Sequence, residues 1–457
     1  MGETQVKQNL KRLAAGAHWR GGWQAASLIF GSDIFLSSPL DTCRSLVRIA
    51  LSERFLPILW FSFSRIAGGF LAAFVLGVSL GFLAHRSDLV RELLAPVVLA
   101  FKSIPVACIV VLLLIWIGSR EVSGFSVFLM AFPALYLATV EGLGQVDRKL
   151  DDMLSVFGVG RLRRLLAHTW PSVLPYLVAT SRNACGMAWK AGVAAELIGT
   201  PMGSMGERIY QSKILLETAD LFAWTVIVVA VSYACEKGFL WLLQETGPLT
   251  LRLSVPRGGE HVVASQKPEG VLLKDASLGY GNTVVIEGVN LALGPGERGV
   301  LTDASGVGKT TFLHTVANLL PVLAGCVQAP RCLSVVFQES RLIELLSAVD
   351  NVLLVGSGGN TREDVRTLLL ELLPAEVLDR PVSELSGGQR RRVEIVRAMA
   401  HPSSAVLLDE PFSSLDEAMH EAAAQFVAGY LAGRTLLVAS HAPEDAALLD
   451  AQQLSLK

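Results

Sequence analysis

The chain has 457 residues, of which 51% are hydrophobic and 18% charged, with 41 acidic against 39 basic side chains. Soluble domains carry about a quarter of their residues charged, so this composition excludes a disordered or fibrous chain and disfavours an entirely soluble enzyme. The charged residues are nevertheless too many for a protein made only of membrane spans. We therefore expect a membrane part joined to a water-soluble part, and the net charge of −2 gives no reason to expect nucleic acid as a partner.

Long apolar runs are concentrated in the first 250 residues. Uncharged stretches cover residues 66–84, 103–119, 122–140 and 221–235, and the last continues through 238–243 after Glu236 and Lys237. Runs of nearly 20 residues have the length that a helix needs to cross a bilayer. A buried core helix is the alternative for any one of them, but four together favour membrane spans.

Two weaker segments complete the count of spans. Residues 171–199 are mostly apolar but contain Arg182, Lys190 and Glu196. Ionisable groups in a span usually face a bundle interior or a water-filled path, so for Lys190 and Glu196 a packing role and a substrate role both stay open. Residues 21–32 contain only twelve uncharged positions, and whether residues 21–36 form a true span is left open.

The basic residues orient these spans. Cytoplasmic loops carry an excess of Lys and Arg, and the loop 147–169 contains five basic side chains, while the loop after residue 84 contains Arg86 and Arg91. Placing both loops in the cytoplasm, together with the basic N-terminus, requires six spans rather than five. We expect an α-helical polytopic membrane domain with about six transmembrane helices.

The character of the chain changes after residue 246. Residues 247–268 are polar and rich in Pro and Gly, as in an interdomain linker. Beyond them, short β-branched runs alternate with helix-like segments, as in an α/β domain. The expected divisions are a transmembrane permease domain at 1–246, a linker at 247–268 and a soluble domain at 269–457.

A phosphate-binding loop is predicted between a strand and a helix of the soluble domain. A strand at 298–301 leads into Asp303-Ala-Ser-Gly-Val-Gly-Lys-Thr-Thr311, and a helical pattern covers 312–320. Glycines let backbone N–H groups approach phosphates, and the helix N-terminus adds its positive end. Lys309 is expected to reach the β and γ phosphates and the Thr310 hydroxyl to bind magnesium. An ordinary Gly-rich turn is the alternative.

Two further motifs weigh against an ordinary turn. Residues 405–410 read as a buried strand that ends in two carboxylates, of which Asp409 suits the magnesium shell and Glu410 can polarise an attacking water. Between the two motifs, residues 385–389 (Leu-Ser-Gly-Gly-Gln) form a loop with few side-chain atoms that opens a basic helix.

Together these motifs resemble the ATP-binding cassette of ABC transporters. Residues 385–389 match the signature sequence of that family, Val336-Phe-Gln338 is similar to its Q-loop, Ser413-Ser-Leu-Asp416 to its D-loop and His441 to its switch histidine. The resemblance implies an α/β P-loop NTPase fold that hydrolyses ATP with Mg²⁺. The catalytic residues that it implies are Glu410, His441 and Gln338, and the magnesium ligands are Thr310, Gln338 and Asp409. The nucleotide-binding residues that it implies are Tyr280, which would stack on adenine, Ser305, Gly306, Gly308, Lys309, Thr310, Thr311, Ser386, Gly387, Gly388 and Gln389.

The same resemblance implies a pair of cassettes. In the family two cassettes meet head to tail, so each ATP would lie between the Lys309 loop of one chain and residues 386–389 of its partner. Gln338 would sense the γ-phosphate or magnesium and report to the membrane part. Phosphoryl transfer needs mainly positioning and charge neutralisation, which these residues supply.

Three departures from the family pattern stand out. Asp303 occupies the position where the family's loop usually begins with glycine; a carboxylate near a triphosphate would weaken binding by repulsion, and the effect of Asp303 on ATP affinity is left open. Ala442 replaces the acidic residue that commonly follows the switch histidine. The 29 positions from Lys309 to Gln338 are few for the family and indicate a trimmed β-subdomain.

A second resemblance covers residues 35–243. The spacing of Asp152, Gly158, His168 and Pro171 is similar to that of the cytoplasmic loop by which importer permeases contact their cassettes, which predicts a helix–turn–helix coupling loop at about 147–171. The alternative is an ordinary basic cytoplasmic loop. Residues 38–41, 65–69, 104–105 and 188–199 resemble permeases of the nitrate, aliphatic sulfonate and taurine importer group.

The two resemblances lead to one hypothesis. The chain is expected to be a fused permease and ATPase, an ATP hydrolase coupled to import of a small solute such as nitrate, a sulfonate or taurine across the cell membrane. Its expected partners are a second copy of the chain, a separate external substrate-binding protein and membrane lipid. The multi-pass domain would lie in the inner or plasma membrane with the ATPase domain in the cytoplasm. An exporter and a non-transporting ATP-dependent regulatory module are the alternatives, and the substrate, the identity of the binding protein and the choice between homodimer and heterodimer stay open.

Overall fold

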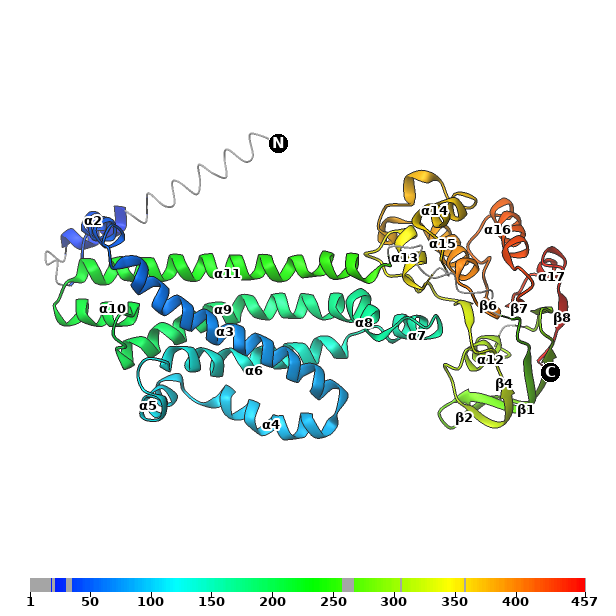
Figure 1. Ribbon diagram of the computed structural model, residues 1–457, viewed down its shortest axis with the longest axis horizontal. Coiled ribbons are helices and arrows are strands. Elements are labelled where there is room, and N and C mark those ends of the chain that lie inside the picture. Colours follow the sequence, from blue (N-terminus) through cyan, green and yellow to red (C-terminus); the bar gives the residue numbers. More distant parts are fainter. Residues whose placement is uncertain are drawn as a thin grey trace. The chain divides into compact units, whose positions relative to one another are not determined.

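The computed structural model of the chain describes residues 18, 21–29, 35–256, 267–304, 306–356 and 359–456 (Figure 1). The chain divides into two compact units. The first unit comprises Met1–Gln145 and Ser172–Thr246, and the second comprises Val146–Pro171 and Gly247–Lys457. The loop at 146–171 therefore belongs to the same compact unit as the soluble domain, although the two are separated by 75 residues of sequence.

Every regular element in the described part of the first unit is a helix. Its helices are α2 (Pro39–Ala50), α3 (Phe55–Arg86), α4 (Asp88–Ser103), α5 (Val106–Ile117), α6 (Val122–Gly144), α9 (Trp170–Gly199), α10 (Met205–Ile214) and α11 (Thr218–Ser254). In the described part of the chain, α3, α6 and α11 are long and apolar enough to cross a membrane, and α4 with α5 counts as a fourth span if this pair, bent by 106°, is taken as one. Residues 21–29 are helical and residues 30–34 lie outside the described residues, so whether residues 21–36 form a true span stays open.

Proline explains the bend between α4 and α5. Helix α4 ends at Ser103, and Pro105, with φ −63° and ψ 134°, precedes the first residue of α5. Proline disfavours a helical conformation at the residue before it, here Ile104, which is extended. The uncharged run 103–119 thus forms one short helix with a sharp entry instead of a straight span.

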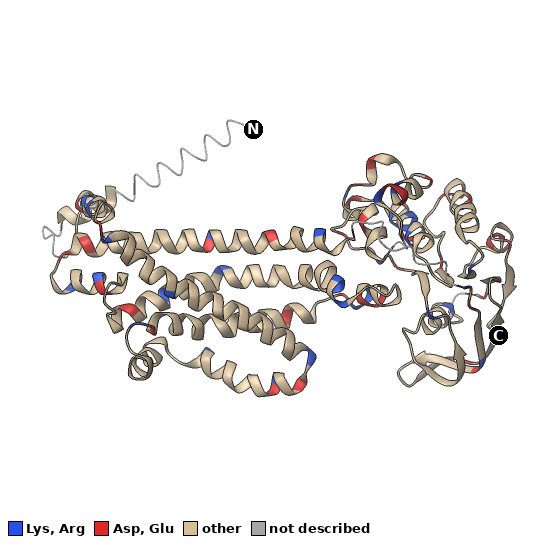
Figure 2. Cartoon of the chain, in the orientation of Figure 1, with Lys and Arg blue, Asp and Glu red and all other residues tan. Residues whose placement is uncertain are grey.

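Glycines allow α3 and α6 to pack closely along their lengths (Figure 1). A Cβ atom at Gly69 would lie 2.2 Å from the carbonyl oxygen of Gly124, and one at Gly81 would lie 2.6 Å from the Cβ of Thr139. Small residues at helix contacts are the usual means by which membrane helices approach each other. Trp60, on α3, is instead 66% exposed, and Figure 2 shows few charges along α3 and α6, as expected for helices of a membrane domain.

The second unit contains two sheets. An antiparallel sheet has the order β2-β1-β4, built from β1 (Val271–Tyr280), β2 (Thr283–Leu293) and β4 (Val322–Gln328). A parallel sheet has the order β5-β6-β7-β3-β8, built from β3 (Arg298–Leu301), β5 (Leu333–Val336), β6 (Ala405–Asp409), β7 (Thr435–Ala439) and β8 (Gln452–Leu454). Strands β5, β6 and β7 are buried at every position, which is typical of parallel strands covered on both faces.

Alternate residues of the parallel sheet enter two separate cores. The helices around it are α12 (Lys309–Val316), α13 (Ala348–Leu354), α14 (Arg362–Leu370), α15 (Gly387–Ala400), α16 (Glu417–Tyr430) and α17 (Glu444–Leu448), with short 3₁₀ turns at Ala375–Val377 and Val382–Glu384. Val406 and Leu408 of β6 pack with residues of α13 to α17. Ala405 and Leu407 pack on the opposite face with α12 and the antiparallel sheet. The fold class expected from the sequence, a helical membrane domain followed by an α/β P-loop domain, is confirmed.

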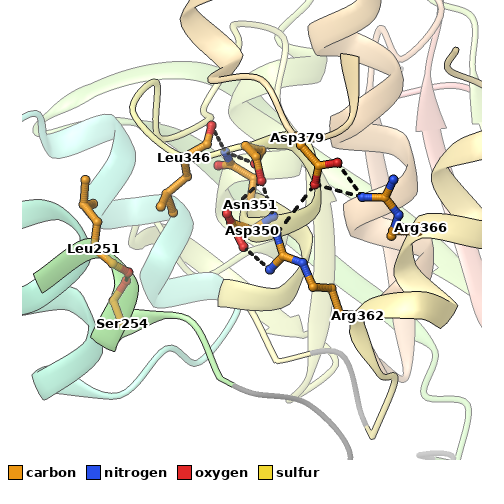
Figure 3. A network of polar contacts seen from close by, with 9 residues as sticks. Leu251, Ser254, Leu346, Asp350, Asn351, Arg362, Arg366 and Asp379 are labelled. Atoms are coloured by element: carbon orange, nitrogen blue, oxygen red, sulfur yellow. Dashed lines mark hydrogen bonds and ion pairs between the residues drawn. The ribbon is translucent and has the colours of Figure 1, made fainter. Parts of the chain in front are cut away.

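Polar contacts fix helices α13 and α14 (Figure 3). The buried Asn351 amide donates to the carbonyls of Ile343, Leu346 and Ser347, and its oxygen accepts from the Ile343 N–H at 2.8 Å. Arg362 pairs with Asp350 and Asp379, and Arg366 pairs with Asp379 at 2.6 Å. Asn351 therefore holds the loop before α13, whereas the arginines join more exposed surfaces.

The loop at 146–171 forms two helices and a turn. Helix α7 (Arg148–Val156) is capped by the Asp147 side chain, Gly158 turns the chain with φ +66°, and α8 (Arg161–Arg164) continues as a π-helical turn at Leu165–Thr169. The apolar face of α7 is buried in the core that contains α12 and the antiparallel sheet. This is the arrangement of helix, turn and helix that the Gly–Pro spacing indicates.

The segment expected to be a linker is partly helical. Helix α11 runs to Ser254, so its last turns cover residues 247–254, and residues 257–266 lie outside the described residues. The domain divisions 1–246, 247–268 and 269–457 stay a prediction.

Candidate active site

The phosphate loop requires glycine at two positions. Gly306 and Gly308 have φ values of +83° and +105°, and Gly308 is the N-cap of α12. A Cβ atom at Gly308 would lie 2.6 Å from the Cδ1 of Ile286. Strand β2 thus packs against the loop, and the amides at the N-terminus of α12 are left to face an anion. Ser305, which the sequence assigns to this loop, lies outside the described residues.

The Lys309 ammonium is held by the loop itself and by the segment after β7. Its Nζ donates to the carbonyl of Asp303 and to the carbonyl of Ser440 at 3.4 Å, and it lies 3.1 Å from Nδ1 of His441. Lys309 is 6% exposed. A buried cation that is held by neutral oxygens and a nitrogen provides a site for a negatively charged ligand.

Glu410 and His441 meet at the carboxyl ends of two neighbouring strands. Strand β6 pairs in parallel with β7, and His441 Nε2 lies 3.0 Å from Glu410 Oε1. Glu410 has φ +49°, a conformation that is strained for a non-glycine residue and that is enriched at functional sites. Its N–H donates to the carbonyl of Ala439 at 2.9 Å, which holds the backbone in this conformation. His441 therefore joins Lys309 to Glu410.

Asp409 has the properties of a metal ligand. Its carboxylate is buried and accepts from Thr310, while Oδ2 has no hydrogen-bond partner in the described part of the chain. Burial raises the pKa of Asp409 to about 6, and the negative charge of Glu410 adds to this shift. A buried carboxylate oxygen without a partner, next to a hydroxyl, fits the oxygen ligands that Mg²⁺ prefers.

The Asp303 carboxylate binds residues after β8 and not the phosphate-binding loop. Oδ1 accepts from the Ser455 hydroxyl at 2.8 Å, and Oδ2 accepts from the Leu456 N–H at 2.9 Å. The carboxylate thus binds the residues that follow β8, which pairs with β3. The sequence leaves the effect of this carboxylate on ATP affinity open, and in the structure the carboxylate anchors the start of the loop.

The signature turn forms a separate surface of the second unit. Ser386 and Gln389 make a capping box at the N-terminus of α15, with Ser386 N donating to Gln389 Oε1 at 3.0 Å. A Cβ atom at Gly388 would lie 3.1 Å from the carbonyl of Ser414, so the turn is next to the D-loop. Ser386 and Gly387 are exposed, and in the described part of the chain no hydrogen bond joins residues 386–389 to the phosphate loop.

Tyr280 and Gln338 lie at the margins of the site. The Thr311 hydroxyl donates to the Tyr280 hydroxyl at 3.4 Å, and Tyr280 is 49% exposed. Gln338 is exposed, and its carbonyl accepts from the Arg391 guanidinium. Of the residues expected from the sequence, the structure brings together Lys309, His441 and Glu410, and separately Thr310 and Asp409.

The contacts that anchor the segment carrying His441 were not predicted from the sequence. Asp445, which is 1% exposed, accepts from the Ser440 hydroxyl and lies 2.6 Å from Nε2 of His420. The His420 ring stacks on Phe412 with the ring centroids 4.7 Å apart. These contacts anchor the segment that carries His441. The only signal in the sequence was an acidic residue in the first turn of a short helix, which ordinarily indicates capping alone.

Glu196 of the membrane unit is fully buried between helices. Its Oε2 accepts from the Ser62 hydroxyl at 2.7 Å and from the Gly206 N–H at 3.2 Å. Ser62 also accepts from the Met205 N–H at 2.9 Å. Glu196 thus joins α3, α9 and the start of α10, which supports the packing role. Lys190 is exposed on α9.

The fold and the site define a P-loop nucleotide-hydrolysing domain that is joined to a helical membrane domain. Residues 286–413 match the family "ABC transporter", and residues 73–235 match "Binding-protein-dependent transport system inner membrane component". The chain belongs to the ABC transporter family, as a permease and an ATPase of the importer type fused in one polypeptide.

Relatives with curated names resemble the ATPase half. The chain is 35% identical over 189 residues to the aliphatic sulfonates import ATP-binding protein SsuB 3 of Nocardia farcinica, covering 41% of this chain and 76% of that protein. It is 37% identical over 186 residues to SsuB 1 of Rhodococcus jostii, covering 39% of this chain and 75% of that protein. For SsuB 1 of Pseudomonas fluorescens the identity is 39% over 137 residues, covering 30% of this chain and about half of the relative, 53%.

Proposed function

We propose that the chain is one half of an ATP-driven importer and that two copies pair to complete two ATP sites and one path for a small solute. The observation that carries this proposal is the contact of His441 with both Lys309 and Glu410 in a chain that also contains a permease domain. Nucleotide hydrolysis and membrane transport are then functions of one polypeptide.

The roles of the site residues follow from their contacts. Lys309 and the amides of residues 306–311 neutralise and hold the β and γ phosphates. Glu410 accepts a proton from the attacking water, and His441 orients Glu410 and the γ-phosphate. Thr310, Asp409 and Gln338 hold Mg²⁺, which, when bound, neutralises charge on the phosphate oxygens. Tyr280 lies beside Thr311, where its ring can stack on adenine.

The signature turn acts on the partner's nucleotide. Residues 386–389 present the N-terminus of the 14-residue helix α15, and Ser386 is exposed at its cap. Exposed N–H groups at a helix N-terminus bind anions. Because this turn makes no hydrogen bond to its own phosphate loop among the described residues, a second copy of the chain is the partner that its position favours.

The solute is a small anion of the sulfonate or nitrate type, delivered by a separate external binding protein. The curated relatives carry the words "aliphatic sulfonates import" in their names, and the permease segment matches a binding-protein-dependent family. Helices α3, α6 and α11 would lie in the cell membrane with the ATPase domain in the cytoplasm, beside the basic loop that contains Arg161.

The proposal is tested by Glu410→Gln in the full chain. We expect the purified variant to lose ATP turnover while it binds ATP with nearly the affinity of the unchanged protein, as measured by phosphate release and by nucleotide binding. If the unchanged chain releases no phosphate in liposomes with its binding protein, the proposed transport function is wrong.

Pairing of two copies has its own test. Ser386→Arg in one copy of a mixed dimer should inactivate the site that contains the other copy's Lys309. If activity is lost only at the phosphate loop of the chain that carries the substitution, the head-to-tail arrangement is refuted.

A further inference from the structure

Arg341 lies where three segments of the second unit meet. It follows the Q-loop by three residues, is 7% exposed and places its guanidinium 3.7 Å from the ring centroid of Phe337. Asn351 forms hydrogen bonds with Ile343 and Leu346, in the segment that follows Arg341 (Figure 3). The Arg341 backbone is therefore held within a structured loop, and its side chain is not free to move into solvent.

Two charged residues of α15 hold the Arg341 backbone on both sides. The Arg341 N–H donates to Glu394 Oε1 at 2.7 Å, and the Arg341 carbonyl accepts from the Arg397 guanidinium at 2.7 Å. Glu394 also pairs with Arg391 at 3.1 Å, and Arg391 donates to the carbonyl of Gln338. Glu394 and Arg397 are almost completely buried. A displacement of α15 must therefore displace Arg341.

The side chain of Arg341 contacts the loop at 146–171. It donates to the carbonyl of Lys149 at 3.3 Å, and its charge acts on the carboxyl of Asp152. Arg397 reaches the same loop, with its guanidinium 5.2 Å from the ring centroid of Phe157. The Lys149 ammonium pairs with Glu339, so the residues after Gln338 contact this loop at several points.

We propose that Arg341 is a positioning residue that transmits the movement of α15, whose N-terminus carries the signature turn, to the loop at 146–171. This inference rests on the proposed function, since it names the residue that carries the coupling between the ATP site and the permease. Arg341 suits this role because its backbone contacts α15 and its side chain contacts the loop. Buried ion pairs and their hydrogen bonds have few alternative arrangements, so the three segments move together.

The test compares Arg341→Met and Arg341→Lys in the full chain, reconstituted in nanodiscs. The reference protein has its native cysteines replaced and carries Glu410→Gln, which prevents ATP hydrolysis. A single cysteine introduced at Met202, which is 88% exposed between α9 and α10, reports on the permease through its rate of reaction with a maleimide. Coupling between two sites typically changes an equilibrium ~5-fold or more, and we expect an ATP-dependent rate change of this size in the reference protein. In Arg341→Met the change should fall below about twofold while ATP affinity stays within about threefold.

Matched variants separate transmission from folding. Arg362→Met removes a partly exposed arginine that pairs only with Asp350 and Asp379 among the described residues (Figure 3), and it should leave the response unchanged. Asp152→Asn keeps the shape of the loop and removes the charge near Arg341, so a reduced response is expected even if Arg341→Met does not fold. Arg341→Lys, which retains the charge, should retain part of the response.

Three results would overturn the proposal in different ways. A full response in both Arg341→Met and Asp152→Asn would show that the coupling takes another route, while the proposed transport function stands. A parallel loss of ATP binding in Arg341→Met would place the residue in the nucleotide site. An absent response in the reference protein would refute both the transmission and the coupled transport on which it rests.

Discussion

The anchoring role of Asp303 can be tested against the role that its position in the phosphate loop indicates. Asp303→Asn keeps the size of the side chain and removes its charge. If the carboxylate faced the γ-phosphate at about 4 Å, each pair of unit charges would repel by about 4 kcal/mol at an effective dielectric of about 20. Removal of the charge would then tighten ATP binding by roughly a thousandfold, at about tenfold per 1.4 kcal/mol.

The structure predicts a different outcome, because the carboxylate accepts from Ser455 and Leu456. Hydrogen bonds to a charged group contribute about 1.5–3 kcal/mol each, and partial exposure of Asp303 reduces this to a total of about 2–3 kcal/mol for the pair. Asp303→Gly, which restores the residue found in related cassettes, should therefore lower the stability of the ATPase domain by about this amount. Asp303→Asn should change ATP affinity by less than about threefold.

Both quantities are measurable in the full chain. Nucleotide affinity is obtained from the fluorescence of a labelled ATP analogue, and stability from thermal unfolding of the ATPase domain with and without nucleotide. Ser455→Ala is the matched control, since it removes one of the two bonds and leaves the loop sequence intact. A tightening of ATP binding by more than about tenfold in Asp303→Asn, with no loss of stability in Asp303→Gly, would refute the anchoring role.

Three further predictions concern the packing of α3 on α6, the anchoring of the His441 segment by Asp445 and the ionisation of Asp409. Gly69→Ala should destabilise the membrane domain, because its Cβ would lie 2.2 Å from the Gly124 carbonyl oxygen. Gly68→Ala, whose Cβ would have no atom within 4 Å, should not destabilise it. The temperature at which each variant aggregates in detergent distinguishes the two. Asp445→Ala should lower the stability of the ATPase domain by about 1–3 kcal/mol, as expected when a buried hydrogen-bond acceptor is removed and its donors are left unpaired, and an unchanged melting temperature would contradict the anchoring role of Asp445. The folded pKa of Asp409 is raised to about 6, so its neutral form is favoured in the folded protein and stability without metal should fall as pH rises towards 6. Mg²⁺ requires the ionised form, so the Mg²⁺ concentration for half-saturation should rise about tenfold per pH unit below about pH 6, and Asp409→Asn should remove this dependence in a binding titration.

The parts of the fold that could be predicted are those with a local pattern. The strand at Arg298–Leu301 and the strand that ends at Asp409 follow from runs of apolar residues before glycine or carboxylate. The helix that begins after Ser386 follows from a Ser and a Gln at capping-box spacing. Each pattern is contained in fewer than about ten residues, and local backbone chemistry decides it.

The contacts that could not be predicted join distant segments. Asp303 and Ser455 are 152 positions apart, and Arg341 and Lys149 are 192 apart. A carboxylate in a phosphate loop can face the nucleotide or the neighbouring chain. The pairing of β3 with β8 places Ser455 and Leu456 beside Asp303, and this pairing is not visible in the sequence. The extent of α11 was also unpredictable, because Pro248 and Gly247 indicate a helix end, yet the helix continues to Ser254.

The burial of α7 in the second unit has a consequence for how the fused chain assembles. Met153, Leu154 and Phe157 fill a core whose other walls are β1, β5 and α12, so an ATPase domain made without the permease half would leave these walls exposed to water. In a fused chain this apolar segment is covalently joined to the ATPase domain, so the two meet within one molecule whatever the amount of protein in the cell. Fusion thus protects an aggregation-prone surface during synthesis and ensures that every permease has its own ATPase.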